Sequence, residues 1–224
     1  MKIYSQNICW TKSKQSRLKI ARFIDKEQPD FVCLQEVVFG YHFNSFLLPN
    51  YHRYWSKKLG AINKGGLVIL SKEKAISYQF VQFSAQGKFN SFQLVERMIS
   101  KGFLVAEFDK FVLINTHLVA SHTKIHRDRD PNNLSQLNEL LDFVDTQTKP
   151  IILAGDLNFS PKSKHYQLLT RHLQDQTKDI FVTFEKFGTK LDYICTTTST
   201  NTTCEIVTLK PFPPSDHFGL LMKI

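Results

Sequence analysis

The sequence predicts an α/β or α+β fold in which large β-sheets are covered on the outside by helices. The first observation is a series of short runs rich in β-branched and aromatic residues, at 2–9, 30–34, 66–71, 102–108, 111–118, 150–155, 191–195, 204–209 and 218–223. The second is that few segments between these runs have helical periodicity, a balance typical of layered folds. The third is that no internal repeat or Gly/Ser- or Pro-rich linker divides the chain, so we expect one domain over residues 1–224.

Three segments place apolar residues at the spacing of a helix face. The first runs through Ile20 and ends before Pro29, and the third begins after Pro161. The middle segment begins at Asn132 or Asn133, one of which we expect to cap the helix. Its apolar face consists of Leu134, Leu137, Leu141 and Val144.

The composition is that of an ordinary globular chain with a basic balance. It is 42% apolar and 22% charged, which excludes disordered and fibrous proteins. Its 29 Lys and Arg against 20 Asp and Glu give a net charge of +9. This charge favours an anionic partner, which is a nucleic acid, a membrane surface or a phosphorylated small molecule. The basic stretch at 12–22 is either a solvated helix face or a patch that steers phosphate.

Cysteine usage and the lack of long apolar segments predict the compartment. The four cysteines form no C-x-x-C pair and show no zinc-ligand spacing, so we expect reduced thiols. The N-terminus has no apolar signal segment, and no run approaches the roughly 18 apolar residues of a membrane span. We therefore expect a monomeric, cytoplasmic protein whose contact with a membrane would be peripheral. The polar run at 196–203 is expected to be a hairpin loop between two strands.

Polar residues that end apolar runs are the candidates for chemistry, because the ends of neighbouring strands point side chains into a shared cleft. Taken alone, each has an ordinary explanation such as a turn or a hydrogen-bonded strand end. Together they are four carboxylates, two histidines and two amides: Asn7, Glu36, His117, Asp156, Asn158, Asp192, Asp216 and His217. Carboxylate and amide oxygens suit Mg²⁺ or Mn²⁺ better than zinc. A divalent ion beside a histidine acid or base is what hydrolysis of a phosphate ester requires.

Short motifs in a fixed order resemble one family. They are NIC at 7–9, LQE at 34–36, GGLVILSK at 65–72, NTHL at 115–118, GDLN at 155–158, LDYI at 191–194 and SDH at 215–217. This order resembles the endonuclease/exonuclease/phosphatase superfamily, which includes pancreatic-type deoxyribonucleases, abasic-site endonucleases, inositol polyphosphate phosphatases and neutral sphingomyelinases. The resemblance covers residues 3–223 and implies a four-layer sandwich of two packed mixed β-sheets flanked by helices.

The resemblance also implies roles at the metal and at the histidine pair. Glu36 would be the principal metal ligand, with Asn7 helping to orient the metal or the phosphate. Asp216 would be a further carboxylate that binds metal or orients water. His217 would be the general base or the group that stabilises the transition state, and Asp192 would orient it.

Around the phosphate, the resemblance implies a second set of residues. Asp156 would align or activate the attacking water, and Asn158 would donate to a phosphoryl oxygen. His117 would contact the phosphate or protonate the leaving group. Arg127 and Lys101 are further candidates for a phosphate contact, although Arg127 could instead pair with the neighbouring aspartates.

The motif details leave the substrate open between two classes. Cys9 stands where abasic-site endonucleases carry an aspartate, which moves the chain away from that branch. The segments GGLVILSK, THLVAS and GDLNFSPKSKHY resemble the sphingomyelinase-like branch. We therefore expect a Mg²⁺-dependent phosphodiesterase, with Mn²⁺ as the other candidate ion. Its substrate would be nucleic acid, or alternatively a phospholipid head group or a phosphomonoester. A catalytically silent binding module is the minor alternative.

Overall fold

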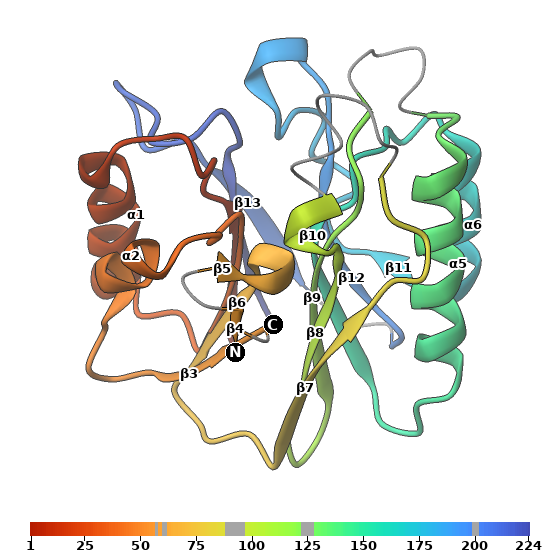
Figure 1. Ribbon diagram of the computed structural model, residues 1–224, viewed down its shortest axis with the longest axis horizontal. Coiled ribbons are helices and arrows are strands. Elements are labelled where there is room, and N and C mark those ends of the chain that lie inside the picture. Colours follow the sequence, from red (N-terminus) through yellow and green to blue (C-terminus); the bar gives the residue numbers. More distant parts are fainter. Residues whose placement is uncertain (57, 60–61, 88–96, 122–127, 199–201) are drawn as a thin grey trace.

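Two six-stranded mixed β-sheets pack face to face in the computed structural model, and helices cover the outer face of each sheet (Figure 1). The structure describes residues 1–56, 58–59, 62–87, 97–121, 128–198 and 202–224. The predicted α/β sandwich of four layers is confirmed. In the described part of the chain, no helix is long and apolar enough to cross a membrane.

The first sheet has the strand order β13-β14-β1-β2-β6-β3. Its strands are β1 (Lys2–Asn7), β2 (Phe31–Gln35), β3 (His52–Trp55), β6 (Val68–Ser71), β13 (Thr203–Val207) and β14 (Gly219–Lys223). β1 pairs in parallel with β2 and antiparallel with β14. The parallel pair at the centre brings the carboxyl ends of β1 and β2 to the same edge of the sheet.

The second sheet has the strand order β11-β12-β10-β9-β8-β7. Its strands are β7 (Ser77–Gln82), β8 (Gly102–Glu107), β9 (Val112–His117), β10 (Ile151–Asp156), β11 (Gln174–Asp175) and β12 (Asp192–Thr196). β9 and β10 are parallel, and β12 is antiparallel to β10. A separate two-stranded ribbon consists of β4 (Lys58–Leu59) and β5 (Ile62–Asn63).

Each sheet has its own helical cover (Figure 1). The helices and 3₁₀ turns are α1 (Lys14–Glu27), α2 (Gly40–Phe43), η1 (Asn44–Phe46), η2 (Lys64–Gly66), α5 (Pro131–Asp145), α6 (Lys164–His172) and η3 (Glu185–Phe187). α1 and α2 lie on the side of the first sheet, and α5 and α6 on the side of the second. The three predicted helices correspond to α1, α5 and α6.

Alternation of side chains divides the central strands between apolar layers. In β1, Ile3 packs in the cluster between the sheets, whereas Tyr4 packs in the cluster under α1. In β10, Ala154 packs between the sheets, whereas Leu153 belongs to the cluster under α5 and α6. Both faces of these strands are therefore buried, which explains why their sequences are almost continuously apolar. Residues at the ends of these strands that share the parity of Ile3 in β1 or of Ala154 in β10 point into the gap between the sheets.

The predicted cap of α5 is wrong. The cap is Asp130, whose carboxylate accepts hydrogen bonds from the backbone nitrogens of Asn132 at 2.9 Å and Asn133 at 3.4 Å. Asn133 is instead fully buried, and its amide donates to the carbonyl oxygens of Val119 and Leu157. The aspartate caps more effectively because it also places negative charge at the positive end of the helix dipole.

The predicted hairpin at 196–203 is also wrong. β12 belongs to the second sheet and β13 to the first, so this polar run crosses between the sheets. Residues 199–201 of the run lie outside the described part of the chain. Five strands were not predicted: β4 and β5 of the small ribbon, and β3, β7 and β11, each of which lies at the edge of a sheet. An edge strand has one strand neighbour and more solvent contact, and this weakens the apolar pattern that identifies a strand.

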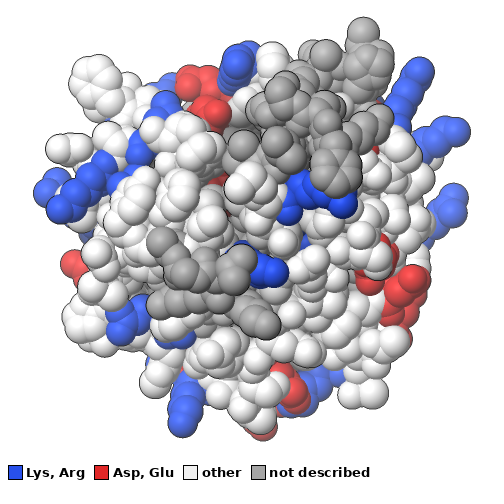
Figure 2. Space-filling model, in the orientation of Figure 1, with Lys and Arg blue, Asp and Glu red and all other residues white. Residues whose placement is uncertain are grey.

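The basic stretch at 12–22 is only partly solvated, because Lys12, Lys14 and Arg22 are exposed whereas Arg17 and Lys19 bond to carbonyl oxygens. Arg17 is buried, and its guanidinium donates to the carbonyl oxygen of Lys12 at 2.7 Å. The Lys19 ammonium donates to the carbonyl oxygen of Phe212 at 2.8 Å. Figure 2 shows that Lys and Arg side chains are spread around the outline of the molecule in this view.

Candidate active site

A row of polar residues crosses the second sheet at one end. Asp156 is paired in register with His117 on β9 and with Asp192 on β12. Paired residues of neighbouring strands point to the same face of a sheet. Asp156 has the same parity as Ala154, which packs between the two sheets. The three polar side chains therefore point into the gap between the sheets, just beyond the apolar layer.

The first sheet contributes three residues to the same end of the gap. Asn7 is the last residue of β1, and Glu36 directly follows β2. His217 lies two residues before β14. Six of the polar residues at strand ends therefore lie at one end of the gap between the sheets: Asn7, Glu36, His117, Asp156, Asp192 and His217.

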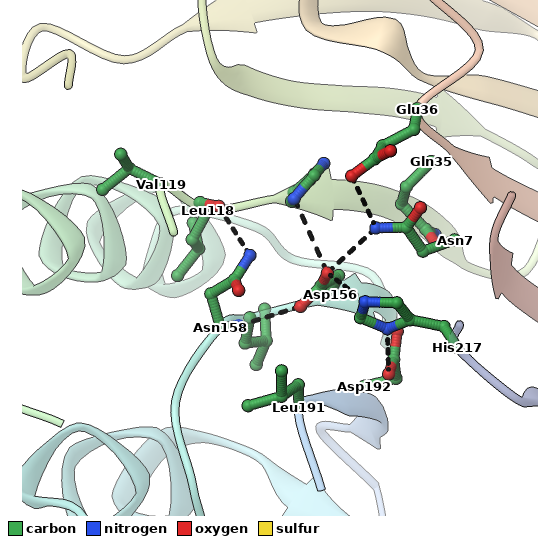
Figure 3. Close-up of polar contacts among 12 residues, drawn as sticks. Asn7, Gln35, Glu36, Leu118, Val119, Asp156, Asn158, Leu191, Asp192 and His217 are labelled. Atoms are coloured by element: carbon green, nitrogen blue, oxygen red, sulfur yellow. Dashed lines mark hydrogen bonds and ion pairs between the residues drawn. The ribbon is translucent and has the colours of Figure 1, made fainter. Parts of the chain in front are cut away.

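Asp156 is the centre of the site and is 1% exposed. Its Oδ2 accepts a hydrogen bond from Nδ2 of Asn7 at 3.0 Å (Figure 3). The same oxygen lies 3.6 Å from Nε2 of His117 and 3.6 Å from Nε2 of His217. Its Oδ1 accepts from the backbone nitrogen of Asn158 at 3.0 Å. One carboxylate thus contacts residues from both sheets.

Asn7 joins Asp156 to Glu36. Its Nδ2 also donates to Oε1 of Glu36 at 3.1 Å (Figure 3), and its Oδ1 accepts from the backbone nitrogen of Cys9 at 3.0 Å. Oε2 of Glu36 accepts from the backbone nitrogen of Trp10 at 2.9 Å. Two carboxylates therefore converge on a single amide nitrogen, and both are held in place by neighbouring donors.

His217 and Asp192 form a buried pair. Nδ1 of His217 lies 2.8 Å from Oδ2 of Asp192 (Figure 3). The hydroxyl of Thr183 donates to the same oxygen at 2.5 Å and accepts from the backbone nitrogens of Leu191 and Asp192 at 2.9 and 3.0 Å. The ring of Phe184 lies 4.7 Å from the imidazole, centroid to centroid. These contacts fix both the position of the ring and the nitrogen that faces Asp156.

The surroundings shift the pKa values of the two histidines in opposite directions. Burial by itself lowers the pKa of His217, but the Asp192 and Asp156 carboxylates raise it above its ordinary value. Burial lowers the pKa of His117 well below its ordinary value, and the positive charges of Lys101 and His217 act in the same direction. Burial also raises the pKa of Asp156, against the opposing effects of His217 and Asn7. These shifts favour a charged imidazole at His217 and a neutral imidazole at His117.

The remaining predicted residues lie at different places. Asn158 is buried, and its Nδ2 donates to the carbonyl oxygen of Leu118 at 3.1 Å (Figure 3). Lys101 is 3% exposed and close enough to affect the pKa of His117. Asp216 is half-buried. Burial, together with the Asp216 and Glu36 carboxylates, raises the pKa of the nearby Cys9 thiol to about 11. Arg127 lies outside the described residues.

Three further residues support the site and were not predicted. The hydroxyl of Ser215 donates to the carbonyl oxygen of Asn7 at 2.7 Å and accepts from the backbone nitrogen of His217 at 3.1 Å. The amide of Gln6 donates to the carbonyl oxygen of His217 at 3.0 Å. The sequence held a signal for two of them, because Ser215 is the first residue of the SDH motif and Gln6 directly precedes Asn7. Thr183 lies in a loop without a motif, so no signal in the sequence indicated it.

Backbone geometry at the site departs from the ordinary. Glu36 and Asn158 have positive φ angles of 63° and 55°, in the left-handed region. Such conformations cost energy for residues other than glycine and are common at functional sites. Gly155 is required for a different reason, because a Cβ there would collide with the carbonyl oxygen of Thr116 on the adjacent strand. The Gly-Asp-Leu-Asn motif therefore combines a close strand contact with a turn that positions two site residues.

Among the described residues, one group could hold a metal ion by geometry alone. Asp156, Asp192 and His217 each offer a ligand atom, and these atoms lie within 4.8 Å of one another. His217, however, uses Nδ1 in its hydrogen bond with Asp192, so only its Nε2 remains for a ligand, whereas the two carboxylates offer the oxygen atoms that Mg²⁺ prefers.

Comparisons with known proteins agree with this geometry. Residues 4–217 match the sequence model of the Endonuclease/Exonuclease/phosphatase family. The chain is 28% identical over 194 residues to Recombination repair protein 1 of Drosophila melanogaster, covering 83% of this chain and 25% of that protein. It is 27% identical over 151 residues to Sphingomyelinase C of Leptospira interrogans, covering 60% of this chain and 26% of that protein.

The chain spans about a quarter of the length of these two curated relatives. A crystal structure of D. rerio TDP2 complexed with a single strand DNA product has the same fold. Its TM-score is 0.76 at 16% identity, and the match covers 100% of this chain and 99% of the other. The family match extends over nearly the whole sequence and includes every candidate site residue from Asn7 to His217. The chain belongs to the endonuclease/exonuclease/phosphatase family, whose members act on phosphoesters.

Proposed function

We propose that the protein is a divalent-metal-dependent phosphodiesterase that hydrolyses nucleic acid. The observation that carries the proposal is the buried carboxylate of Asp156, which lies 3.6 Å from the imidazolium of His217 and shares the amide of Asn7 with Glu36. A base, an acid and a carboxylate for a metal are thereby held within one small region. This combination is what attack of water on a phosphodiester requires.

The residue that would hold Mg²⁺, or Mn²⁺ in its place, is Glu36, with Asn7 helping to orient the metal or the phosphate. The donor set supports this, because carboxylate oxygens are hard ligands. The Asn7 amide nitrogen donates to Glu36 at 3.1 Å and to Asp156 at 3.0 Å, so the metal ligand lies next to the proposed base. A bound ion would neutralise charge on the phosphoryl group. Asp216 would add a carboxylate at the edge of this region.

Asp156 and His217 would move the protons. Burial raises the pKa of Asp156, which makes its carboxylate basic enough to accept a proton from water near neutral pH. His217 would stabilise negative charge on the phosphate or donate a proton from Nε2. Its Nδ1 is occupied by Asp192, which fixes the orientation of the ring and helps to keep it charged. In this arrangement the aspartate is the base and the histidine is the cation.

His117, Asn158 and Lys101 would bind the phosphate. The lowered pKa of His117 supports a neutral imidazole that contacts the phosphate and argues against an imidazolium that protonates the leaving group. One hydrogen of the Asn158 amide is used by Leu118, and the second remains for a phosphoryl oxygen. Lys101 is buried nearby and would supply a fixed positive charge. Arg127 is proposed on sequence grounds alone.

Nucleic acid is the preferred substrate, and phospholipid is the second candidate. The net charge of +9 and the relative named for recombination repair favour nucleic acid. The relative named as a sphingomyelinase favours a phospholipid head group, with peripheral contact to a membrane. We also propose, from the sequence reasoning above, that the protein is a cytoplasmic monomer. Size-exclusion chromatography and cell fractionation test these two points.

The first experiment measures nicking of supercoiled plasmid and cleavage of a single-stranded oligonucleotide with Mg²⁺. We expect cleavage that EDTA abolishes and that His217→Ala lowers by at least about a hundredfold, the scale of an acid–base group. His172→Ala is the matched control, because His172 pairs with Asp145 on the surface. Sphingomyelin hydrolysis without any DNA cleavage would replace the first candidate with the second. An equally active His217→Ala protein would exclude His217 from the mechanism.

The second experiment tests the metal site. Titration calorimetry with Mg²⁺ should detect binding to the native protein and a large loss of affinity in Glu36→Ala. Glu73→Ala is a suitable control, because Glu73 is an exposed glutamate that has no contact with the site residues in the hydrogen bonds described above. Binding that survives Glu36→Ala unchanged would remove Glu36 from the metal site.

A further inference from the structure

Three aromatic side chains gather beside Glu36 and have no part in the chemistry proposed above. We call Trp10, Phe39 and Tyr41 the aromatic platform. The rings of Trp10 and Phe39 lie 5.8 Å apart, and those of Phe39 and Tyr41 lie 5.5 Å apart with an angle of 6° between their planes. Trp10 belongs to the loop after β1, whereas the other two belong to the turn that begins α2.

The aromatic platform is supported from within the protein. His42 is fully buried, and its ring lies 4.5 Å from that of Tyr41 and 5.4 Å from that of Phe39. The guanidinium carbon of Arg17, which α1 holds in a buried position, lies 5.4 Å from the centre of the Tyr41 ring. Tyr41 nevertheless remains 58% exposed. The inner side of the Tyr41 ring is therefore held by the protein, and its outer side is open to a ligand from solvent.

The aromatic platform is also tied to the catalytic region. The backbone nitrogen of Trp10 donates to Oε2 of Glu36 at 2.9 Å. Phe39 follows Glu36 by three residues. A phosphate bound beside Glu36 would therefore place the adjoining part of the substrate next to these rings.

We propose that the aromatic platform stacks with an unpaired nucleobase adjacent to the scissile phosphate. This inference rests on the nuclease function proposed above and specifies its substrate. Exposed aromatic rings bind bases of single strands because every base has a flat π-face. Inside a duplex both faces of a base are already stacked, so the platform selects single strands, strand ends or unpaired nucleotides.

Electrostatics favour a nucleobase over a quaternary ammonium head group, which is the other part of a phosphoester substrate that aromatic rings bind. Such a head group is held by the negative faces of aromatic rings. At Tyr41 the positive guanidinium of Arg17 already interacts with the ring and is buried behind it. A second cation on this ring would be repelled at short range by the buried charge of Arg17. A base is uncharged and meets no such repulsion.

A binding experiment tests the inference without catalysis. The sequence has two tryptophans, so Trp55→Phe leaves Trp10 as the single tryptophan fluorophore. In EDTA, we expect a thymidine oligonucleotide to quench this fluorescence and to bind more tightly than an abasic sugar–phosphate chain of the same length. Tyr41→Ala should weaken oligonucleotide binding by about 5- to 100-fold, the range for the loss of one base stack. Equal affinity for the two chains, or stronger quenching by phosphocholine, would overturn the inference.

A kinetic experiment separates this inference from the proposed function. The readout is the ratio of kcat/KM for the base-bearing chain to that for the abasic chain. Tyr41→Ala should lower this preference by about 5- to 100-fold, mainly through KM, and Tyr41→Phe should restore it. Tyr78→Ala is the matched control, because Tyr78 is 53% exposed on the edge strand β7. A Tyr41→Ala protein with unchanged preference refutes the platform, whereas a native protein that cleaves neither chain refutes the nuclease function.

Discussion

At the scale of single residues, the charge of His217 depends on its carboxylate neighbours. Burial opposes the charged imidazole, and Asp192 and Asp156 offset that cost. Asp192→Asn keeps the shape and removes one charge, so the pKa of His217 should fall and the rate should drop about a hundredfold or more. A proton–nitrogen NMR titration of the imidazole measures the pKa directly.

A second aspartate–histidine pair is the control for that prediction. Asp145 and His172 lie 3.0 Å apart on the surface, with the Asp145 side chain 55% exposed. Asp145→Asn should leave the rate and the pKa of His217 unchanged, since exposed pairs are screened by solvent. An unchanged pKa of His217 in Asp192→Asn would contradict the role given to the carboxylate.

His42, under the aromatic platform, makes stability depend on pH. Burial, together with the positive charge of Arg17, lowers the pKa of His42 to about 4. The unfolded imidazole has a pKa near 6.5, so between about pH 6.5 and 4 the unfolded chain binds a proton that the folded chain does not. Its contribution to stability is therefore complete above about pH 6.5 and is lost as the pH falls toward 4.

The substitution His42→Gln removes the imidazole that binds this proton. The unfolding free energy should therefore depend less steeply on pH in that window. Urea denaturation at intervals from pH 4.5 to 7.5 measures the slope. His172→Gln is the control, because His172 is partly exposed and pairs with Asp145 away from the aromatic platform. Identical slopes in the native and His42→Gln proteins would show that His42 does not titrate differently on folding.

At the scale of elements, α5 shows which leucines of an amphipathic helix contribute to the free energy of unfolding. The sequence placed Leu134 and Leu137 on one face, yet Leu134 is 37% exposed and Leu137 is fully buried. Leu137→Ala should lower the free energy of unfolding by about 2–5 kcal/mol, because it leaves a cavity in the layer under the helix. Leu134→Ala should cost well under half as much. Urea denaturation of both variants checks the difference, and equal losses would contradict the assigned face.

At the scale of the whole molecule, the site exists because two sheets meet. Asn7, Glu36 and His217 come from the first sheet, whereas His117, Asp156 and Asp192 come from the second. A buried bond between the sheets lies directly behind the site, where the amide of Gln35 donates to Oδ1 of Asn115 at 2.8 Å. Because buried polar groups must be paired, this contact favours one alignment of the sheets over others.

The overall charge leads to a prediction about salt. Basic side chains are spread around the face in Figure 2, so binding of a polyanion would release counterions. Raising the salt from 50 to 200 mM should lower kcat/KM for an oligonucleotide by about tenfold or more. The small diester bis(p-nitrophenyl) phosphate, with a single phosphate, should respond much less. An equal response of both substrates would show that the net charge has no part in substrate binding.

The sequence by itself determined the strand-rich layered fold, the three main helices and the identity of the polar residues at the strand ends. These features depend on local patterns, such as apolar runs, helical spacing and motif order. Central strands were found because both of their faces are buried. Among the edge strands, β13 was found, whereas β7 was missed because its exposed side chains weaken the pattern. The cap of α5 was misassigned because Asp130 and the two asparagines after it are all good cap residues.

Only the tertiary structure decided which polar residues meet and which charges they carry. Thr183 and Asp192 are neighbours through a loop that no motif identified, and the two histidines have opposite pKa shifts in the same gap. The pKa of each histidine depends on its burial and on charged groups within a few ångströms. These charged groups are distant from the histidines in sequence. The packing of the two sheets brings them together, because residues far apart along the chain then share one poorly solvated space.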